Sequence, residues 1–594
     1  MDKKYLKVFS SAFALSLVLT GCASGSSSNK SERKTKPKVE FKSTVENSGT
    51  VDGEATLKVG VLSGDTLVGL WNPVFYLNAE DYQVIGLMVG NTFPTDETYR
   101  LKQDDKEAPV AFHFDKDKKE TTLTIHKDLK WSNGEDVTSK DIIATYNIMG
   151  NPEYKENVRY NDSLENIEGM KEYHEGKAKT ISGIVAKDDK TVVIKYKEAK
   201  PSLQWGDGFI ENFLNAGQVE KVTDFTKFAE AELNKKPLSY GPYVISKEVN
   251  GESVLLEANP HFYKKDKIKN KKVEVKVVQP SQASAMMKNG EIDLMGNLTP
   301  NVWEGSKDSD KGTILGKDSF YMSYVGFKTG KFDKDKGEVV VDPNAKLSDV
   351  KLRQALMYAV DRDQINERIY KGLRFTPTGS GMYPAATGLT NPNAKLFKKD
   401  VEKAKQLLDE AGYKDTNGDG IREGKDGKPF SLNFAIRNTG SDYDQTLADT
   451  FLKSWKEVGI DVKLNDSKLM APKDWSQRVQ ADDPTIEIFQ GAWQYGTNPN
   501  REELLGAKAP LNLYRYMDDN IKEAFKTQQT AEMFDIKKLT EAYNKFDDQV
   551  AEVLPYFPLS WNTDLAWVSK RVKNYDMDKV SHGDQNIYEL ELLK

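Results

Sequence analysis

Few side chains in this sequence are spaced for catalysis. His174 and Glu175 begin the H-E-x-x-H pattern of catalytic zinc sites, but position 178 is alanine, so the second histidine ligand is missing. The sequence contains neither a G-x-S-x-G nucleophile turn nor a Walker lysine motif. The other histidines are scattered along the chain: His113, His126, His261 and His582. A serine–histidine–aspartate site assembled from distant loops remains an alternative, but we expect neither an enzyme nor a cofactor.

One acidic loop has the spacing of a calcium site. Asp415, Asn417 and Asp419 place oxygen ligands at alternate positions, and glycine stands sixth, as in the first half of an EF-hand loop. The ninth position is Glu423, but the twelfth is aspartate instead of glutamate, and a strand pattern follows instead of a helix. Because Asp, Asn and Gly also build ordinary turns, we favour a turn and keep a structural calcium site as the alternative.

The N-terminus has the pattern of an export signal. Lysines at positions 3, 4 and 7 precede an uncharged apolar run over residues 8–19, which is too short to cross a bilayer core of roughly 30 Å. The next residues, Leu19-Thr20-Gly21-Cys22, resemble the lipobox of bacterial lipoproteins. The resemblance implies that residues 1–21 are removed and that Cys22 is acylated. Cys22 is the sole cysteine, so no disulfide competes for it.

The residues after Cys22 predict a flexible tether. Residues 22–53 are rich in Ser, Lys, Glu, Thr and Asn, and their apolar residues are widely scattered, so little apolar surface is available to offset ordering. Removing residues 1–21 takes away three lysines and one aspartate, which changes the net charge from −6 to −8. An acidic balance without a basic block argues against nucleic acid as a partner.

The remaining body is longer than one core normally supports, so two or three domains are expected. Asp349, Asp361 and Asp400 each stand where they would cap a helix, and glycines 372 and 412 stand where two of these helices would end. Strand-like alternation marks residues 55–61, 121–125, 191–196, 253–257, 273–278 and 432–436. Strands and helices alternate throughout, which predicts an α/β fold with mixed sheets.

Several segments, in order, resemble the peptide/nickel class of extracytoplasmic solute-binding proteins. Residues 121–149 combine a strand, a turn at Asn133-Gly134 and a helix opened at Thr138 or Ser139. The other matching segments are residues 239–244, 350–372, 404–413 and 455–464. Residues 169–184 narrow the resemblance to the oligopeptide-binding lipoproteins of Gram-positive bacterial ABC importers.

The resemblance implies two lobes with an extra inserted domain and a ligand cleft between the lobes. The first lobe is expected to combine residues 54–80, 236–320 and 562–594, with the inserted domain over 81–235 and the second lobe over 321–561. An extended peptide offers a regular set of backbone donors and acceptors, so strand-like pairing can bind it whatever its sequence. The implied partners are oligopeptides, the permease subunits of an ABC importer and, through the lipid, the extracytoplasmic face of the cell membrane. We expect a monomer.

The ligand-binding candidates follow from the same resemblance. Residues 489–500 resemble the family's tryptophan-containing binding segment, and they supply Trp493, Gln494, Tyr495, Gly496 and Asn498. The family often has an aspartate shortly after this tryptophan, which pairs with the peptide amine; here no acid follows, which predicts binding mainly through the peptide backbone.

The resemblance also places Ser63, Gly64 and Asp65, after the first strand, beside the ligand. Aromatic candidates of lower rank are Trp71, Tyr76, Tyr240, Tyr383 and Trp561. Core packing is the competing interpretation of every aromatic residue, Trp493 included. A peptide-pheromone receptor, a dipeptide-binding protein and a nickel-binding protein remain alternative functions on the same scaffold.

Overall fold

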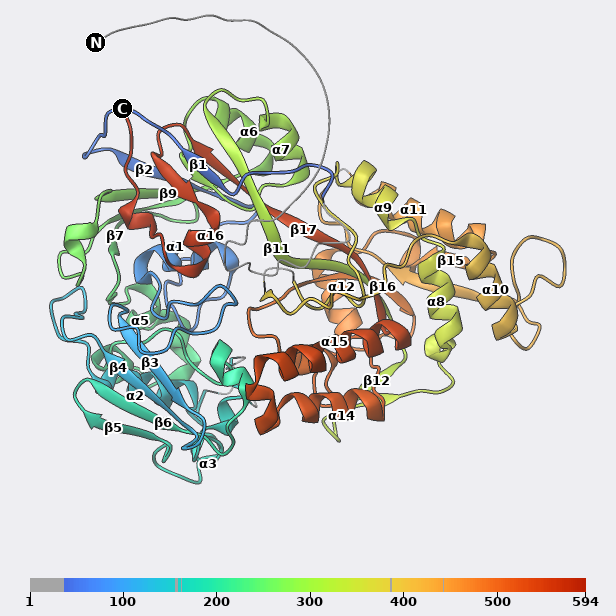
Figure 1. Cartoon of the computed structure of the whole chain (residues 1–594), viewed down its shortest axis with the longest axis horizontal. Helices are drawn as coiled ribbons and strands as arrows, with labels where there is room; N and C mark the ends of the chain where they lie inside the picture. The colour runs from blue at the N-terminus through green and yellow to red at the C-terminus, as the bar shows by residue number, and fades with distance from the viewer. Residues whose placement is uncertain (1–36, 155–156, 158, 162, 385–386, 442) are drawn as a thin grey trace, which may run out of the picture. The chain divides into compact units, whose positions relative to one another are not determined.

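The computed structural model describes residues 37–594 except 155–156, 158, 162, 385–386 and 442 (Figure 1). Cys22 and the predicted signal segment therefore lie outside the described residues. Within the described part of the chain, no helix is both long and apolar enough to cross a bilayer.

A ten-stranded mixed sheet forms the centre of the fold and confirms the predicted α/β class with mixed sheets. Its strands, in spatial order, are β15 (Asp461–Leu464), β14 (Ser431–Ala435), β16 (Ile488–Gln494), β11 (Gly312–Phe327), β17 (Tyr556–Ser569), β10 (Leu294–Met295), β2 (Thr56–Leu62), β9 (Lys272–Val278), β8 (Ser253–Ala258) and β7 (Tyr243–Val249). Four of these strands, β2, β8, β9 and β14, match segments that the sequence predicts, and the other two predicted segments match strands of the inserted domain described below. Alternating side chains of these segments are buried, as their period-two pattern requires.

The antiparallel strands β11 and β17 cross from one half of this sheet to the other. The two strands pair with each other along most of their length. In the first lobe β17 also pairs with β10, and in the second lobe β11 also pairs with β16. The pairing is interrupted between Asp318↔Thr563 and Met322↔Trp561. This irregularity, which we name the crossing, coincides with residues 320–321 and 561–562, where the sequence analysis places the boundaries between the two lobes.

The first lobe and the inserted domain have separate apolar cores. Strands β2, β7, β8 and β9 pack with helix α1 (Ala79–Val89) in the first lobe. The boundary predicted after residue 80 is therefore wrong, because it cuts α1, whose buried residues Val84, Ile85 and Met88 belong to the first-lobe core. The inserted domain has a four-stranded antiparallel sheet: β3 (Val110–Asp115), β4 (Glu120–Ile125), β6 (Thr191–Lys195) and β5 (Ile184–Asp188).

The turn at residues 239–242 shows why the sequence has glycine between these two parts. A Cβ atom at Gly241 would lie 2.1 Å from the carbonyl oxygen of Met88 at the end of α1. The Ser239 hydroxyl donates to the same carbonyl at 2.9 Å. Only glycine lets the chain pass this close to the helix end.

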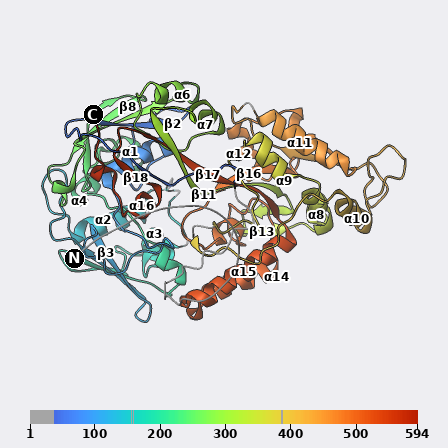
Figure 2. The ribbon, with the colours of Figure 1, turned by 45° about the horizontal axis from the view of Figure 1, so that its top comes forward.

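Helices cover both faces of the sheet in the second lobe. Helices α8, α10 and α11 pack on one face, and α12, α14 and α15 pack on the other; Figures 1 and 2 show α11 and α15 on opposite sides of β16. The bounds of these helices are α8 Val350–Tyr358, α10 Val401–Ala411, α11 Asp444–Glu457, α12 Pro472–Gln480, α14 Asp519–Gln528 and α15 Ile536–Val553. Beyond them, the shorter helix α9 (Arg362–Gln364) runs into a π-helical turn over Ile365–Ile369.

The predicted helix caps are confirmed. The Asp349 carboxylate accepts from the Lys351 amide, and the Asp400 carboxylate accepts from the Lys403 amide at 2.8 Å. Gly412 ends α10 in the left-handed region, with φ of 90°. Thr138 and Asp141 form a capping box at the start of α2 (Ser139–Met149). The remaining helices are α3 (Met170–His174), α4 (Ala216–Val219), α5 (Glu232–Lys235), α6 (Pro280–Lys288), α7 (Pro300–Ser306), α13 (Glu502–Leu505) and α16 (Met577–His582).

Residues 37–53 correct the prediction of a tether that ends at residue 53. Strand β1 (Thr44–Glu46) pairs antiparallel with β18 (Asn574–Asp576), and Val51 bridges to Leu593. From residue 37 to 47, odd-numbered side chains are partly buried and even-numbered ones are exposed. The scattered apolar residues thus have the period of a strand, and their partners lie at the other end of the sequence. A second strand pair, β12 (Gly330–Asp333) and β13 (Glu338–Val341), completes the strands.

Candidate functional site

The central sheet directs the carboxyl ends of parallel strands from both lobes toward the crossing. Strands β2, β9 and β10 run in the same direction as β11, so their last residues point toward the second lobe. Strands β14, β15 and β16 run against β11, so their last residues point toward the first lobe. Ligands of open α/β sheets bind outside the carboxyl ends of strands. The loops after these six strands are therefore the candidate site.

The crossing itself offers polar atoms to a partner. Residues 319–321 of β11 lie opposite the single residue Asn562 of β17, which leaves a bulge. Among the described residues, the buried oxygens Ser560 Oγ, Asn562 Oδ1 and Thr563 Oγ1 have no hydrogen-bond partner. Burial also raises the pKa of the Asp564 carboxyl above its ordinary value. Because buried polar atoms are normally paired, this stretch is suited to bind the donors and acceptors of another chain.

Trp493 lies on β16 at the candidate site and also packs against the protein. Its indole stacks on Tyr324 with a ring separation of 5.9 Å, and its Nε1 donates to the Tyr514 hydroxyl at 2.9 Å. The side chain is partly buried, while its neighbour Gln494 and the following Gly496 are exposed. Trp493 is therefore partly packed and partly accessible. This fits both roles that the sequence analysis considers, which are ligand contact and core packing.

A buried arginine lies among the predicted site residues that follow β16. Arg501 is 1% exposed, and its guanidinium carbon lies 4.5 Å from the Tyr495 ring and 5.7 Å from the Tyr383 ring. Its Nε donates to the Met382 carbonyl and its Nη1 to the Asn498 carbonyl, but its Nη2 has no partner among the described residues. The structure thus brings three predicted site residues, Tyr383, Tyr495 and Asn498, around one cation that the sequence analysis missed.

Two carboxyl groups near this cluster have raised pKa values. Burial raises the pKa of Glu503, although Arg501 opposes the shift. Burial raises the pKa of Asp547 to about 7, even though it accepts hydrogen bonds from the amide and the hydroxyl of Ser380. Both carboxyl groups therefore lie in surroundings that disfavour their charged form.

Arg437 is the second cation that the sequence analysis missed. It follows β14 at the carboxyl edge, and its guanidinium carbon lies 4.9 Å from the ring of Trp475. Its Nε is buried without a partner in the described structure, and none of the ion pairs among described residues includes it. Other arginines of the second lobe differ: Arg478 pairs with Asp466 and Asp483, and Arg515 pairs with Asp482. The position of Arg437 directly after the strand predicted over residues 432–436 is the signal available in the sequence.

The first-lobe candidates divide between the carboxyl edge and the cores. Residues 63–65 follow β2, with Gly64 and Asp65 exposed and the Ser63 hydroxyl donating to Glu80 at 2.7 Å. Trp71 and Tyr240 are each 1% exposed. Trp71 belongs to the first-lobe core, and its indole donates to the exposed Glu248 at 3.3 Å.

Tyr240 packs edge-on against Trp131 at 5.4 Å in the inserted domain. Core packing therefore explains Trp71 and Tyr240, and neither is brought to the candidate site. Trp561 lies on β17 at the crossing, 5.7 Å from the Tyr495 ring. Tyr76 instead packs against Tyr82 at 4.3 Å and under Arg159 at 3.9 Å.

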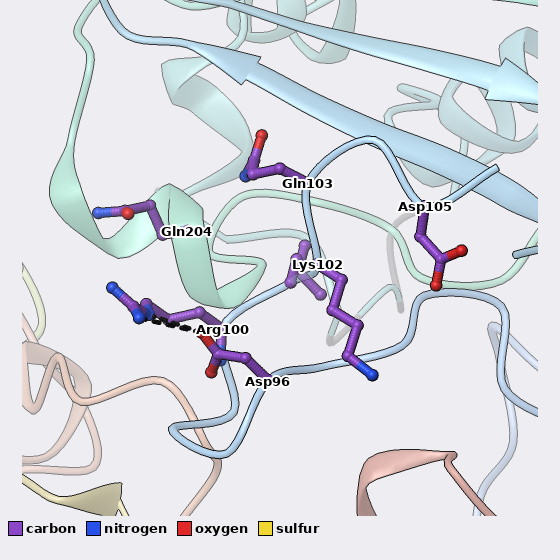
Figure 3. A pocket seen from close by; sticks show the side chains of 7 residues that line it. Asp96, Arg100, Lys102, Gln103, Asp105 and Gln204 are labelled. Atoms are coloured by element: carbon purple, nitrogen blue, oxygen red, sulfur yellow. Dashed lines mark hydrogen bonds and ion pairs between the residues drawn. The ribbon is translucent and has the colours of Figure 1, made fainter. Parts of the chain in front are cut away.

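Two cavities accompany these elements. One of about 550 Å³ lies at the carboxyl ends of β14 and β15, between Asn438, Lys468 and Arg478. The other, of about 590 Å³, lies in the inserted domain between the loop that carries Arg100 and Lys102 and the side chain of Gln204 (Figure 3). Neither cavity is lined by a predicted site residue, and the second is also distant in sequence from the strands of the candidate site. Its Arg100 pairs with Asp96, and its Lys102 pairs with Asp584.

The acidic loop satisfies its own oxygens. Asp415 accepts from the amides of Gly418 and Gly420 at 2.7 and 2.9 Å, and Asp419 accepts from Ile421 at 2.7 Å. Asn417 accepts from the Asp419 amide and donates to Glu423. Among residues 37–594 as described, no group of three or more His, Cys, Asp or Glu side chains is arranged to hold a metal. These bonds are those of an ordinary turn.

Comparisons with known proteins agree with this architecture. Residues 111–507 match the family of bacterial extracellular solute-binding proteins, family 5 (middle part). The oligopeptide-binding protein OppA of Lactococcus lactis subsp. lactis is 31% identical over 473 residues, which cover 78% of each chain.

Solved structures confirm the predicted two-lobed fold. Lactococcal OppA, complexed with an endogenous peptide in the closed conformation, superposes with a TM-score of 0.78 at 28% identity, covering 90% of this chain and 99% of that one. AppA from Bacillus subtilis, in complex with a nonapeptide, shares the fold with a TM-score of 0.67 at 21% identity, covering 91% and 100%. This chain belongs to the bacterial extracellular solute-binding proteins of family 5.

Proposed function

We propose that this protein binds oligopeptides between its two lobes and delivers them to an ABC importer. The family consists of solute-binding proteins, so the chain is not an enzyme. The observation that carries the peptide assignment is the crossing. There the carboxyl edges of both lobes converge on the buried oxygens of Ser560, Asn562 and Thr563, which have no partner in the described part of the chain. An extended peptide backbone supplies matching donors and acceptors at regular spacing. The similarity to OppA supports the same solute class.

The surroundings of the crossing fit a ligand of varied sequence. The cavity at the ends of β14 and β15 offers space of about 550 Å³ for side chains. Trp493 presents an aromatic surface, and the cations Arg437 and Arg501 each have a buried nitrogen without a hydrogen-bond partner among the described residues. Neither cation attracts a peptide amine, and both favour carbonyl or carboxylate groups. Recognition is therefore expected to rest on backbone pairing and not on the free N-terminus.

The histidines do not favour nickel as the solute. His113 pairs with Asp104, His126 packs on Tyr263, and His174 stacks on Tyr160. His261 lies beside Gly134, and His582 packs on Tyr99. The five rings are thus dispersed over different contacts and form no common site.

Calorimetry with a defined nonapeptide and its N-acetylated twin tests the assignment. Both should bind, with affinities within about tenfold of each other, or about 1.4 kcal/mol. If neither peptide binds, while mass spectrometry of the purified protein finds another small solute, the peptide assignment is wrong. A loss above a hundredfold on acetylation would show instead that an acid anchors the amine.

We further propose that Cys22 anchors the protein by an acyl chain to the extracytoplasmic face of the cell membrane, where it meets the permease as a monomer. The lipobox-like Leu19-Thr20-Gly21-Cys22 supports this proposal. Two or more acyl chains give stable membrane attachment at about 0.8 kcal/mol per buried CH₂. The Cys22→Ser variant should leave the membrane fraction after a high-salt wash; if it stays, another anchor holds the protein.

A further inference from the structure

The N-terminal segment of the described chain contacts both lobes. Residues 38–47, which we name the strap, are extended, with odd-numbered side chains toward the protein and even-numbered ones toward solvent. Figure 1 shows this dark-blue segment crossing β11 on its way to β1. The strap thus lies across one of the two strands that connect the lobes.

At its beginning the strap is attached to the second lobe. The backbone amides of Lys38 and Val39 both donate to the Gly372 carbonyl, at 3.0 and 3.3 Å. The Lys38 amine forms an ion pair with Glu367, and both side chains are more than half exposed. Gly372 has φ of +75°, and a Cβ atom there would lie 2.9 Å from Lys38 Cβ. This attachment depends on one carbonyl and one exposed ion pair, and exposed pairs contribute little.

In its middle the strap fills a seam between the lobes. The Gly316 amide of β11 donates to the Lys42 carbonyl at 3.0 Å, and a Cβ atom at Gly316 would lie 2.7 Å from the Phe41 ring. Phe41 packs edge-on against Trp303 of α7 at 6.4 Å. The apolar cluster beneath Val39 and Phe41 contains both first-lobe residues, such as Trp303, and Leu373 of the second lobe.

At its end the strap is held firmly by the first lobe. Residues 44–46 pair in register with β18, and the Met577 amide donates to the Ser43 carbonyl at 3.0 Å. The Asn47 amide donates to the Lys573 carbonyl, and its side-chain nitrogen donates to the carbonyls of Ser569 and Val572. The first-lobe end therefore has many more hydrogen bonds than the second-lobe end.

We infer that the strap is a third connection between the lobes, whose attachment at Gly372 restrains lobe separation and releases when the lobes move apart. The strap is already extended, and an extended chain cannot lengthen beyond about 3.3–3.6 Å per residue. A motion that increases the distance between Gly372 and β18 must therefore break the weaker end. The effect on ligand retention rests on the proposed binding between the lobes.

Two variants of the full chain test this inference. Phe41→Asp places a carboxylate in the apolar seam, whereas the neighbouring Lys42→Asp places the same group on the exposed side of the strap. In Phe41→Asp, the Gly316 amide should exchange with deuterium at least about tenfold faster. The ligand-free radius of gyration should increase, and a labelled nonapeptide should dissociate at least about threefold faster, as release of a restraint requires. Lys42→Asp should behave as the unmodified protein in all three measurements.

Lys38→Pro weakens the second-lobe end independently, because it removes the Lys38 amide and amine, two of the three donors at this end, and leaves only the Val39 amide. The inference is wrong if Gly316 exchanges faster in either releasing variant while scattering and dissociation match Lys42→Asp. It is also wrong if the Val39 amide, which donates to the Gly372 carbonyl, stays protected from exchange in both variants, because the attachment would then not be releasable. If no variant binds peptide, and neither does the unmodified protein, the proposed function fails, while exchange and scattering still decide the strap.

Discussion

The carboxyl edges of the two lobes face the same crossing but present different chemistry. The second-lobe edge has the aromatic surface of Trp493 and a cation, Arg437, without a charge partner among the described residues. The first-lobe edge at residues 63–65 is small, polar and exposed, and its nearest tryptophan, Trp71, is fully packed. From this difference we expect side-chain selectivity to reside mainly in the second lobe, and the first lobe to contribute backbone contacts and closure.

The largest effect expected from this comparison concerns stability and not binding. Trp71→Ala should lower the free energy of unfolding by about 3–5 kcal/mol, because it removes a tryptophan that is 1% exposed in the first-lobe core. Chemical denaturation measures this loss, and Trp71→Phe should lose less. The peptide affinity of the folded fraction should stay within about twofold. A loss of affinity with stability intact would place Trp71 in the site after all.

The matching substitution in the second lobe should weaken peptide binding instead of lowering stability. Trp493→Ala should weaken peptide binding by about 1–3 kcal/mol, the value of burying a large apolar side chain under the ligand. Calorimetry measures the affinity, with Trp493→Phe as the variant that retains most of it. If Trp493→Ala lowers the melting temperature and leaves affinity intact, its stacking on Tyr324 is its only role.

Removing the charge of Arg437 should test whether the second-lobe edge selects peptides that have a carboxylate. Arg437→Gln should weaken binding of peptides with a carboxylate at the matching position by about tenfold, because a guanidinium binds carboxylates in a charge-assisted pair. The carboxylate can come from the peptide's C-terminus or from a glutamate side chain. A peptide amidated at its C-terminus removes the first source, and a peptide with Gln in place of Glu removes the second. Equal losses for all these peptides would show that Arg437 only supports Trp475.

The smallest expected effect is that of calcium, which should not change the thermal stability of the protein. The protein should have the same melting temperature in millimolar calcium and in excess chelator. The carboxylates of the turn at residues 415–426 already accept hydrogen bonds from backbone amides. A bound ion at a hundredfold excess over its dissociation constant would stabilise the protein by about 2.7 kcal/mol. A shift of several degrees that disappears in Asp419→Ala would establish a calcium site.

Local signals in the sequence predicted local structure well. The caps at Thr138, Asp349 and Asp400 and the ends of α10 depend on neighbouring residues, so their side chains could be interpreted without the fold. The positions of the crossings came from family resemblance, because two strands more than two hundred residues apart have no local signal for their pairing.

Contacts across the sequence explain what was missed. The strap's apolar residues Val39, Phe41 and Val45 have a strand period, but their partners lie at β11, α7 and β18, so the sequence alone predicts a tether. Arg437 and Arg501 are single arginines in sequence, and only the fold shows that each has a buried nitrogen without a partner among the described residues. Trp71 and Trp493 are the same residue type, and only their environments separate core from candidate site.

Small-angle scattering tests the central claim, that a peptide binds by closing the two lobes about the crossing. A ligand that touches both edges has higher affinity for the closed state, which is the only way it can shift that population. The radius of gyration should therefore be smaller with saturating nonapeptide than without it, and more so in the unmodified protein than in Trp493→Ala at the same peptide concentration. An unchanged scattering profile, with calorimetry showing saturation of the same sample, would contradict closure.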